Sequence, residues 1–231
     1  MRASSLFVSA AALTLTAPLA WSVPSSPMPS GGAGGSAGAM SQSPHERALL
    51  EYNSGLDEAK KADDLETQAL KESDPKQQEK GLRKAHYGYV SARHYFDDAT
   101  RHEPNMPEAW NELGYAYRKS GDNQAALKAY ERALTLRPGY PEALEYRGEA
   151  YLGLNRLDDA KQVYLDLFSS NREISAHLLT AMKSWVEQHR KAGGTPDAAT
   201  VDEFDKWVQE RSQITAQTTS LTRAGAAASW N

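Results

Sequence analysis

Histidine and carboxylate side chains are the first candidates for chemistry, because histidine is the usual acid, base or metal ligand in proteins. His94, Asp98 and His102 recur every four residues, a spacing that would place them on one face of a helix. The outer two would lie about 12 Å apart at 1.5 Å per residue, so one metal ion cannot bind all three. A metal-binding or enzymatic role for His94 and Asp98 is therefore an alternative, set against a solvated helix face.

Other catalytic patterns are missing from the sequence. The chain has no cysteine, which excludes disulfides, thiolate metal sites and a cysteine nucleophile. It has no H-E-x-x-H motif and no glycine-rich phosphate loop. The pairs Asp97-Asp98 and Asp158-Asp159 are adjacent, so their carboxylates diverge on a helix. The sequence predicts a protein that is not an enzyme and that uses no cofactor or metal.

An internal repeat indicates the structural elements that would position such residues. Pro107 and Pro141 open two segments that lie 34 residues apart, and Pro-Glu-Ala begins both. The first segment spans residues 107–140 and the second spans 141–174. Equivalent positions carry the same residue type in Gly114 and Gly148, Tyr117 and Tyr151, Ala126 and Ala160, and Tyr130 and Tyr164.

The spacing within each segment predicts a pair of antiparallel helices. Four residues fall at i, i+3, i+4 and i+7 on the first helix: Trp110, Leu113, Gly114 and Tyr117. The second helix presents Ala126, Tyr130 and Ala133, and Pro138 ends it. Small residues let the helices approach while aromatic side chains fill the space beside them.

This pattern resembles the tetratricopeptide repeat family. Together with the N-terminal sequence described below, it resembles an exported, bacterial-type member of that family. The family pattern W-x2-L-G-x2-Y, followed by Ala, an aromatic residue, Ala and Pro, is met in full by residues 107–140. The second copy departs from it at Leu144, Arg147 and Arg172. The resemblance implies an all-α helical solenoid of about three helix-turn-helix units.

The first unit, residues 44–104, is longer than the repeat. Ala92, Phe96, Ala99 and Pro104 fit a second helix, and Gly55 fits the glycine position of a first helix. The additional residues between Gly55 and Ala92, compared with the repeat, predict a hairpin with elongated arms that turns near residues 73–75. A disordered charged insertion is the alternative interpretation. A coiled-coil seam supports the hairpin, with spacings of 3 and 4 through Leu82, Ala85, Tyr89, Ala92, Phe96 and Ala99. An approximate facing stripe consists of Leu56, Ala59, Ala62, Leu65 and Ala69.

The two ends of the chain lack the repeat. Residues 175–217 predict two amphipathic capping helices, because a repeat stack needs a cap with a polar outer side. Residues 218–231 are expected to be a flexible tail. Residues 1–22 are typical of a signal peptide, followed by a flexible Pro/Gly/Ser leader over 23–43. We expect export to the periplasm without a membrane span after cleavage, and secretion or an uncleaved anchor are alternatives.

The resemblance implies that a protein or peptide partner binds a concave groove lined by the first helix of each unit. The corresponding residues are Tyr52, Asn111, Tyr115, Arg118, Glu142, Glu145, Tyr146 and Glu149, with Leu152 beside them. Glu145 and Glu149, one helical turn apart, favour a partner that carries Lys or Arg, unless these carboxylates are only a solubilising surface.

The expected function is that of a scaffold or adaptor in the cell envelope. A net charge of −4 argues against a nucleic-acid partner. A self-assembling structural protein that uses the long hairpin and the caps is a further alternative.

Overall fold

The computed structural model describes residues 43–228, with side chains for 43–217, and this part of the chain is built from α-helices alone. The expected signal peptide and nearly all of the leader lie outside the described residues. The helices are α1 (Pro44–Lys71), α2 (Pro75–His102), α3 (Pro107–Lys119), α4 (Asn123–Leu136), α5 (Pro141–Gly153), α6 (Leu157–Ser170), α7 (Arg172–Ala192) and α8 (Ala198–Ala228).

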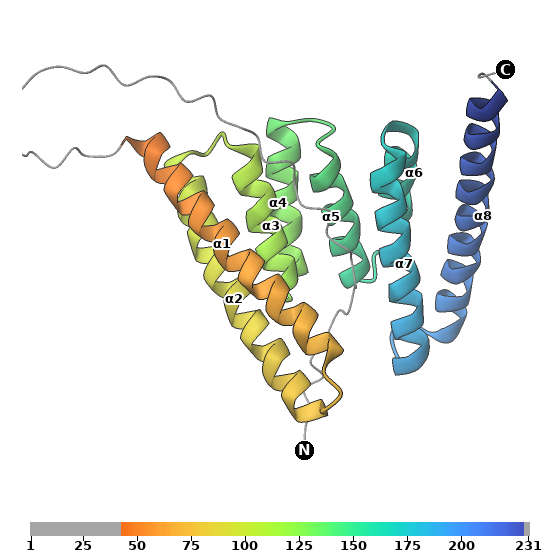
Figure 1. Ribbon diagram of the computed structural model, residues 1–231, viewed down its shortest axis with the longest axis horizontal. Helices are drawn as coiled ribbons and strands as arrows, with labels where there is room; N and C mark the ends of the chain where they lie inside the picture. Colours follow the sequence, from red (N-terminus) through yellow and green to blue (C-terminus); the bar gives the residue numbers. More distant parts are fainter. Residues whose placement is uncertain (1–42, 229–231) are drawn as a thin grey trace, which may run out of the picture.

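The helices follow one another along a stack, as Figure 1 shows. Each helix packs against its neighbours in sequence, and the first helices of successive hairpins, α1, α3, α5 and α7, also contact one another. The predicted all-α repeat solenoid is confirmed. Over the range that the structure describes, no helix is both long and apolar enough to cross a membrane.

The α1–α2 hairpin confirms the predicted elongated arms, each 28 residues long. Its loop end extends past the other helices (Figure 1). α1 begins with a capping box, in which the Ser43 hydroxyl accepts from the Glu46 backbone and the Glu46 carboxylate accepts from the Ser43 backbone. Asp74 caps α2 by accepting from the Lys76 and Gln77 backbone N–H groups. The chain therefore reverses between Lys71 and Pro75.

Small residues set how closely α1 and α2 approach. Buried residues on the two facing stripes are Gly55, Ala59, Ala62, Ala69, Ala85, Tyr89, Ala92, Phe96 and Ala99. A Cβ atom on Gly88 would lie 2.8 Å from the Cβ of Ala62, and one on Gly55 would lie 2.6 Å from the Phe96 ring. Two arms of this length pack together because alanine and glycine predominate where they cross.

The repeat units α3–α4 and α5–α6 share their turn geometry. Gly121 takes a φ of 92°, and Asn155 takes a φ of 57° at the equivalent place. Asparagine is one of the few residues with a side chain that adopts this left-handed conformation readily. Asp122 then caps α4 through the Ala125 N–H group, whereas Arg156 gives α6 no side-chain cap.

The large aromatics of the two repeats pack differently, although they align in sequence. The Tyr130 ring covers Gly114, whereas Gly148 is covered by Leu178 of α7 and by Val163. Tyr164 instead packs against Trp207 of α8, with ring centroids 5.4 Å apart. The difference arises because α7 and α8 supply an apolar core at this end of the stack.

The C-terminal helices close the stack, as the predicted fold requires. The Trp185 indole donates to the backbone carbonyl of Leu152 across a 2.9 Å distance, which ties α7 to α5. Phe204 of α8 packs edge-on against Trp185 at 5.2 Å. α8 continues to Ala228, so the last helix ends later than residue 217, where the sequence predicts a flexible tail.

Replacing Gly114 with alanine should lower the free energy of unfolding by about 1–3 kcal/mol, the usual range for overpacking a core. The new Cβ would lie 2.5 Å from the Tyr130 ring, which is itself fully buried and cannot retreat. Gly153→Ala is the matched control, because its Cβ meets only the movable end of the Asn123 side chain. Urea unfolding measures both variants. Equal stabilities would show that helix propensity, and not the Tyr130 contact, sets the effect.

Candidate functional site

The candidate site is the surface made by the first helices of the hairpins, α1, α3, α5 and α7, which we call the first-helix surface. Its first part joins α1 to α3. The Tyr115 hydroxyl donates to Asp63 Oδ1 at 2.5 Å, and the Tyr89 hydroxyl of α2 donates to the same oxygen at 2.6 Å. Lys119 forms an ion pair with Glu66. The elongated arm of α1 thus carries two acidic side chains across to α3.

The second part joins α3 to α5 through an ion pair. Arg118 Nη1 lies 2.5 Å from Glu149 Oε2, with side-chain exposures of 13% and 6%. The same guanidinium lies 5.3 Å from the ring centroids of both Tyr115 and Tyr146, at a cation–π distance. The two rings are 5.4 Å apart. Glu149, which the sequence places in the groove, is therefore already paired within the chain.

The third part joins α5 to α7. Glu145 is 4% exposed, and its Oε1 lies 3.6 Å from His177 Nδ1. Burial, and then the neighbouring Glu149 carboxylate, raise the pKa of Glu145 to about 8. Arg118 opposes this effect without reversing it. The Glu145 carboxyl therefore retains its proton over much of the neutral range.

Glu112 of α3 is a second carboxyl with a raised pKa. Burial raises the pKa of Glu112 to about 7, and a hydrogen bond from Asn111 Nδ2 at 3.0 Å lowers it in part. The carboxylates of Asp63 and Glu142 act in the same direction as burial. Asn111 itself is 1% exposed, so this member of the predicted site is almost entirely internal.

The remaining predicted site residues lie at the margins of this surface. Tyr52 of α1 is half-buried against Phe96, with ring centroids 5.9 Å apart. Burial, and then the Glu112 carboxylate, raise its pKa above the ordinary range, which places Tyr52 on the side of α3 that carries Glu112. Glu142 is exposed at the start of α5. Leu152 is buried in the apolar core beside α7.

Carboxylates outnumber cations on the first-helix surface. The acidic side chains are Asp63, Glu66, Glu112, Glu142, Glu145 and Glu149, and the cations that pair with members of this set are Arg118 and Lys119. Sequence reasoning did not identify Asp63, Glu66, Glu112, Lys119 or His177 as members. Glu112 could have been found as the neighbour of Asn111, but the others depend on which side chains face each other across separate helices.

The histidine and aspartate candidates lie elsewhere, on the outer side of α2. His94 is exposed, and Asp98 accepts a hydrogen bond from Arg101 Nη1 at 2.7 Å. Among residues 43–228, no three or more potential ligands gather in a way that could hold a metal ion.

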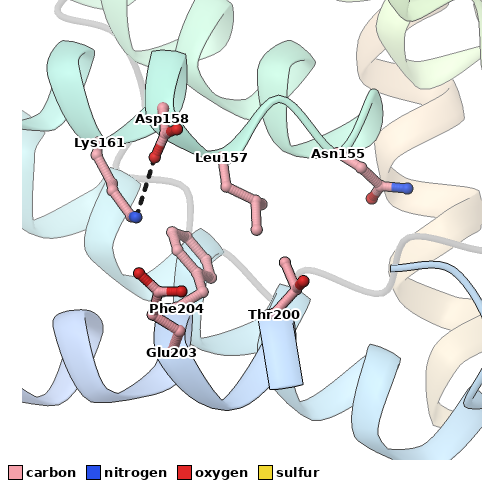
Figure 2. A pocket seen from close by; sticks show the side chains of 7 residues that line it. All are labelled: Asn155, Leu157, Asp158, Lys161, Thr200, Glu203 and Phe204. Carbon is pink, nitrogen blue, oxygen red and sulfur yellow. Dashed lines mark hydrogen bonds and ion pairs between the residues drawn. The ribbon is translucent and has the colours of Figure 1, made fainter. Parts of the chain in front are cut away.

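A small cavity of about 230 Å³ lies between the start of α6 and the start of α8 (Figure 2). Phe204 and Leu157 form its apolar lining, and Lys161 Nζ lies 3.1 Å from Asp158 Oδ1 at one side. The Asp158 side chain is 96% exposed, so this ion pair is largely solvated. The cavity is remote in the fold from α3, and it shares no residue with the first-helix surface.

Comparison with known proteins agrees with this geometry. Residues 88–141 and residues 112–170 each match the model of the tetratricopeptide repeat, in overlapping registers that extend from α2 to the end of α6. No curated protein matches the chain. The repeat units α3–α4 and α5–α6, with the part of α2 from residue 88 onward, are thus the matched region. The described part of the chain is an all-α helical solenoid, and residues 88–170 of it match the tetratricopeptide repeat.

Proposed function

We propose that the chain is a non-catalytic scaffold or adaptor of the cell envelope, whose first-helix surface binds a protein or peptide partner that carries Lys or Arg. Tetratricopeptide repeats generally mediate protein–protein interaction, and the family is typically non-catalytic. The observation that carries the proposal is the excess of carboxylates on this surface. Such an excess attracts basic partners and repels acidic ones.

Aromatic side chains support the same assignment. Tyr115 and Tyr146 stand beside the carboxylates and offer flat contact area with few rotatable bonds, which is favourable for binding. The envelope location is supported by the signal-like pattern of the N-terminal sequence.

Site-specific photo-crosslinking in the cells that produce the protein tests the proposal. A photoreactive phenylalanine at Glu142, which is exposed beside the buried carboxylates, should capture a defined partner protein in the envelope fraction. The same amino acid at Glu131, exposed on α4, is the matched control and should not capture it. Capture from Glu131 alone, or from neither position, would contradict the proposal. A product of twice the chain's own mass would indicate self-assembly instead.

A further inference from the structure

Two buried oxygens between α3 and α5 have no hydrogen-bond donor within the described residues. They are Oδ1 of Asn111, a residue that is 1% exposed, and Oε1 of Glu149, which is 8% exposed. Buried polar atoms are nearly always satisfied in native proteins, and each unsatisfied one costs about 1–3 kcal/mol. Both atoms are acceptors, so the group that satisfies them must supply N–H or O–H donors.

The surroundings of these oxygens can accommodate a positive charge once the neighbouring carboxyls ionise. Arg118 serves only Oε2 of Glu149 and leaves Oε1 without a donor. Glu145 lies beside Glu149, and its closest nitrogen on α7, Nδ1 of His177, is 3.6 Å away, beyond normal hydrogen-bond range. Glu112 receives one hydrogen bond, from Asn111. Three carboxyl groups and one amide oxygen thus face a region served by a single guanidinium.

The rings beside these groups are suited to a second guanidinium. The guanidinium of Arg118 already lies 5.3 Å from the ring centroids of Tyr115 and Tyr146, so these rings can pack against such a group. Burial, and then the charges of Glu112 and Glu145, raise the pKa of the Tyr146 hydroxyl, and the Glu149 carboxylate acts in the same direction. The Tyr146 ring is therefore close to all three carboxyl groups. Tyr146 is partly exposed and Glu142 is exposed, so this group of residues borders on solvent.

We propose that Asn111, Glu112, Glu145 and Glu149 form a seat for one arginine side chain of the partner, beside the Tyr146 ring. The proposal rests on the function proposed above and names the group that the first-helix surface recognises. A guanidinium presents five N–H donors in a planar fork, which can span acceptors on two neighbouring helices.

Binding of arginine at this seat should expel protons. Glu145 is faced by Glu142 and Glu149 on its own helix, by Arg118 of α3, and by His177 of α7. Glu112 is faced by Asn111 on its own helix, by Asp63 of α1 and by Glu142 of α5. Because the pKa values of Glu112 and Glu145 are about 7 and about 8, both carboxyls retain protons at mildly acidic pH and must lose them to pair with a cation. Affinity should therefore rise from pH 6 to pH 8, by at least about tenfold for each of the two carboxyls that must ionise.

The test is an NMR titration of the full chain with the peptide acetyl-Gly-Arg-Gly-amide. Amide shifts should concentrate in α3 and α5, around Asn111 and Glu145. The same peptide with citrulline, the uncharged isostere of arginine, should bind about tenfold more weakly or not at all. Glu145→Gln should weaken arginine binding by a similar factor, and Glu131→Gln on α4 should leave it unchanged.

Three results would overturn the seat: equal binding of the citrulline peptide, shifts confined to other helices, or no shift at about 10 mM arginine peptide. A lack of change between pH 6 and pH 8 would overturn the proton exchange. If a crosslinker at Glu142 still captures a partner while the arginine peptide fails, the protein-binding function stands and only the arginine seat is wrong.

Discussion

Arg118→Ala is expected to lower the free energy of unfolding by about 3–5 kcal/mol, the range found when a buried ion pair loses one member. The variant leaves the Glu149 carboxylate buried beside Glu145, with no cation at 2.5 Å. It also removes the guanidinium that lies over Tyr115 and Tyr146. The loss therefore combines an uncompensated charge with lost packing, and both terms have the same sign.

The measurement is urea unfolding at pH 8, compared with two further variants. Lys60→Ala breaks an exposed pair with Asp64 on α1, where the side chains are 77% and 62% exposed, and it should cost less than about 1 kcal/mol. Arg118→Met combined with Glu149→Met removes both charges and should recover most of the lost stability, because apolar groups of similar volume replace such pairs well. If Arg118→Ala costs no more than Lys60→Ala, the pair between α3 and α5 does not stabilise the stack.

The hairpins were predictable because helix packing depends on residue size at regular positions. Gly114, Ala126 and Tyr130 recur at the repeat spacing, and a 34-residue period can be read without knowing any distance in space. The long first hairpin was predictable for a similar reason. Its seam, from Ala85 to Ala99, follows a heptad-like spacing that only a paired helix uses in full.

The chemistry of the first-helix surface was predictable only in part. Asn111, Tyr115 and Arg118 could be predicted as site residues because they lie outside the packing positions of the repeat. The sequence does not show, however, that Arg118 reaches Glu149. That contact depends on the distance and rotation between α3 and α5. The link from Asp63 to Tyr115 depends likewise on the path of the elongated α1, which no repeat period encodes. Tyr164 illustrates the same limit, because its neighbour Trp207 comes from outside the repeats.

Glu145→Gln is expected to make the protein more stable than the wild type at pH 8, while the two proteins should have similar stabilities at pH 5. The carboxyl has an ordinary pKa of 4.5 and a pKa of about 8 in the folded state. Between these values the folded state binds more protons than the unfolded state, so the stability of the wild type falls as pH rises. The neutral amide has no proton to lose, and the gain at pH 8 should be on the order of 2–4 kcal/mol.

Urea unfolding at both pH values measures this difference, and Glu131→Gln on the exposed side of α4 is the matched control. The control should follow the wild type at both pH values. Parallel pH profiles for Glu145→Gln and the wild type would show that Glu145 ionises in the folded protein as it does in water. The same substitution should weaken binding of the arginine peptide, so stability and binding should change in opposite directions. A carboxyl that destabilises the fold near pH 8 and yet occupies the middle of the stack is more consistent with a binding role than with a packing role.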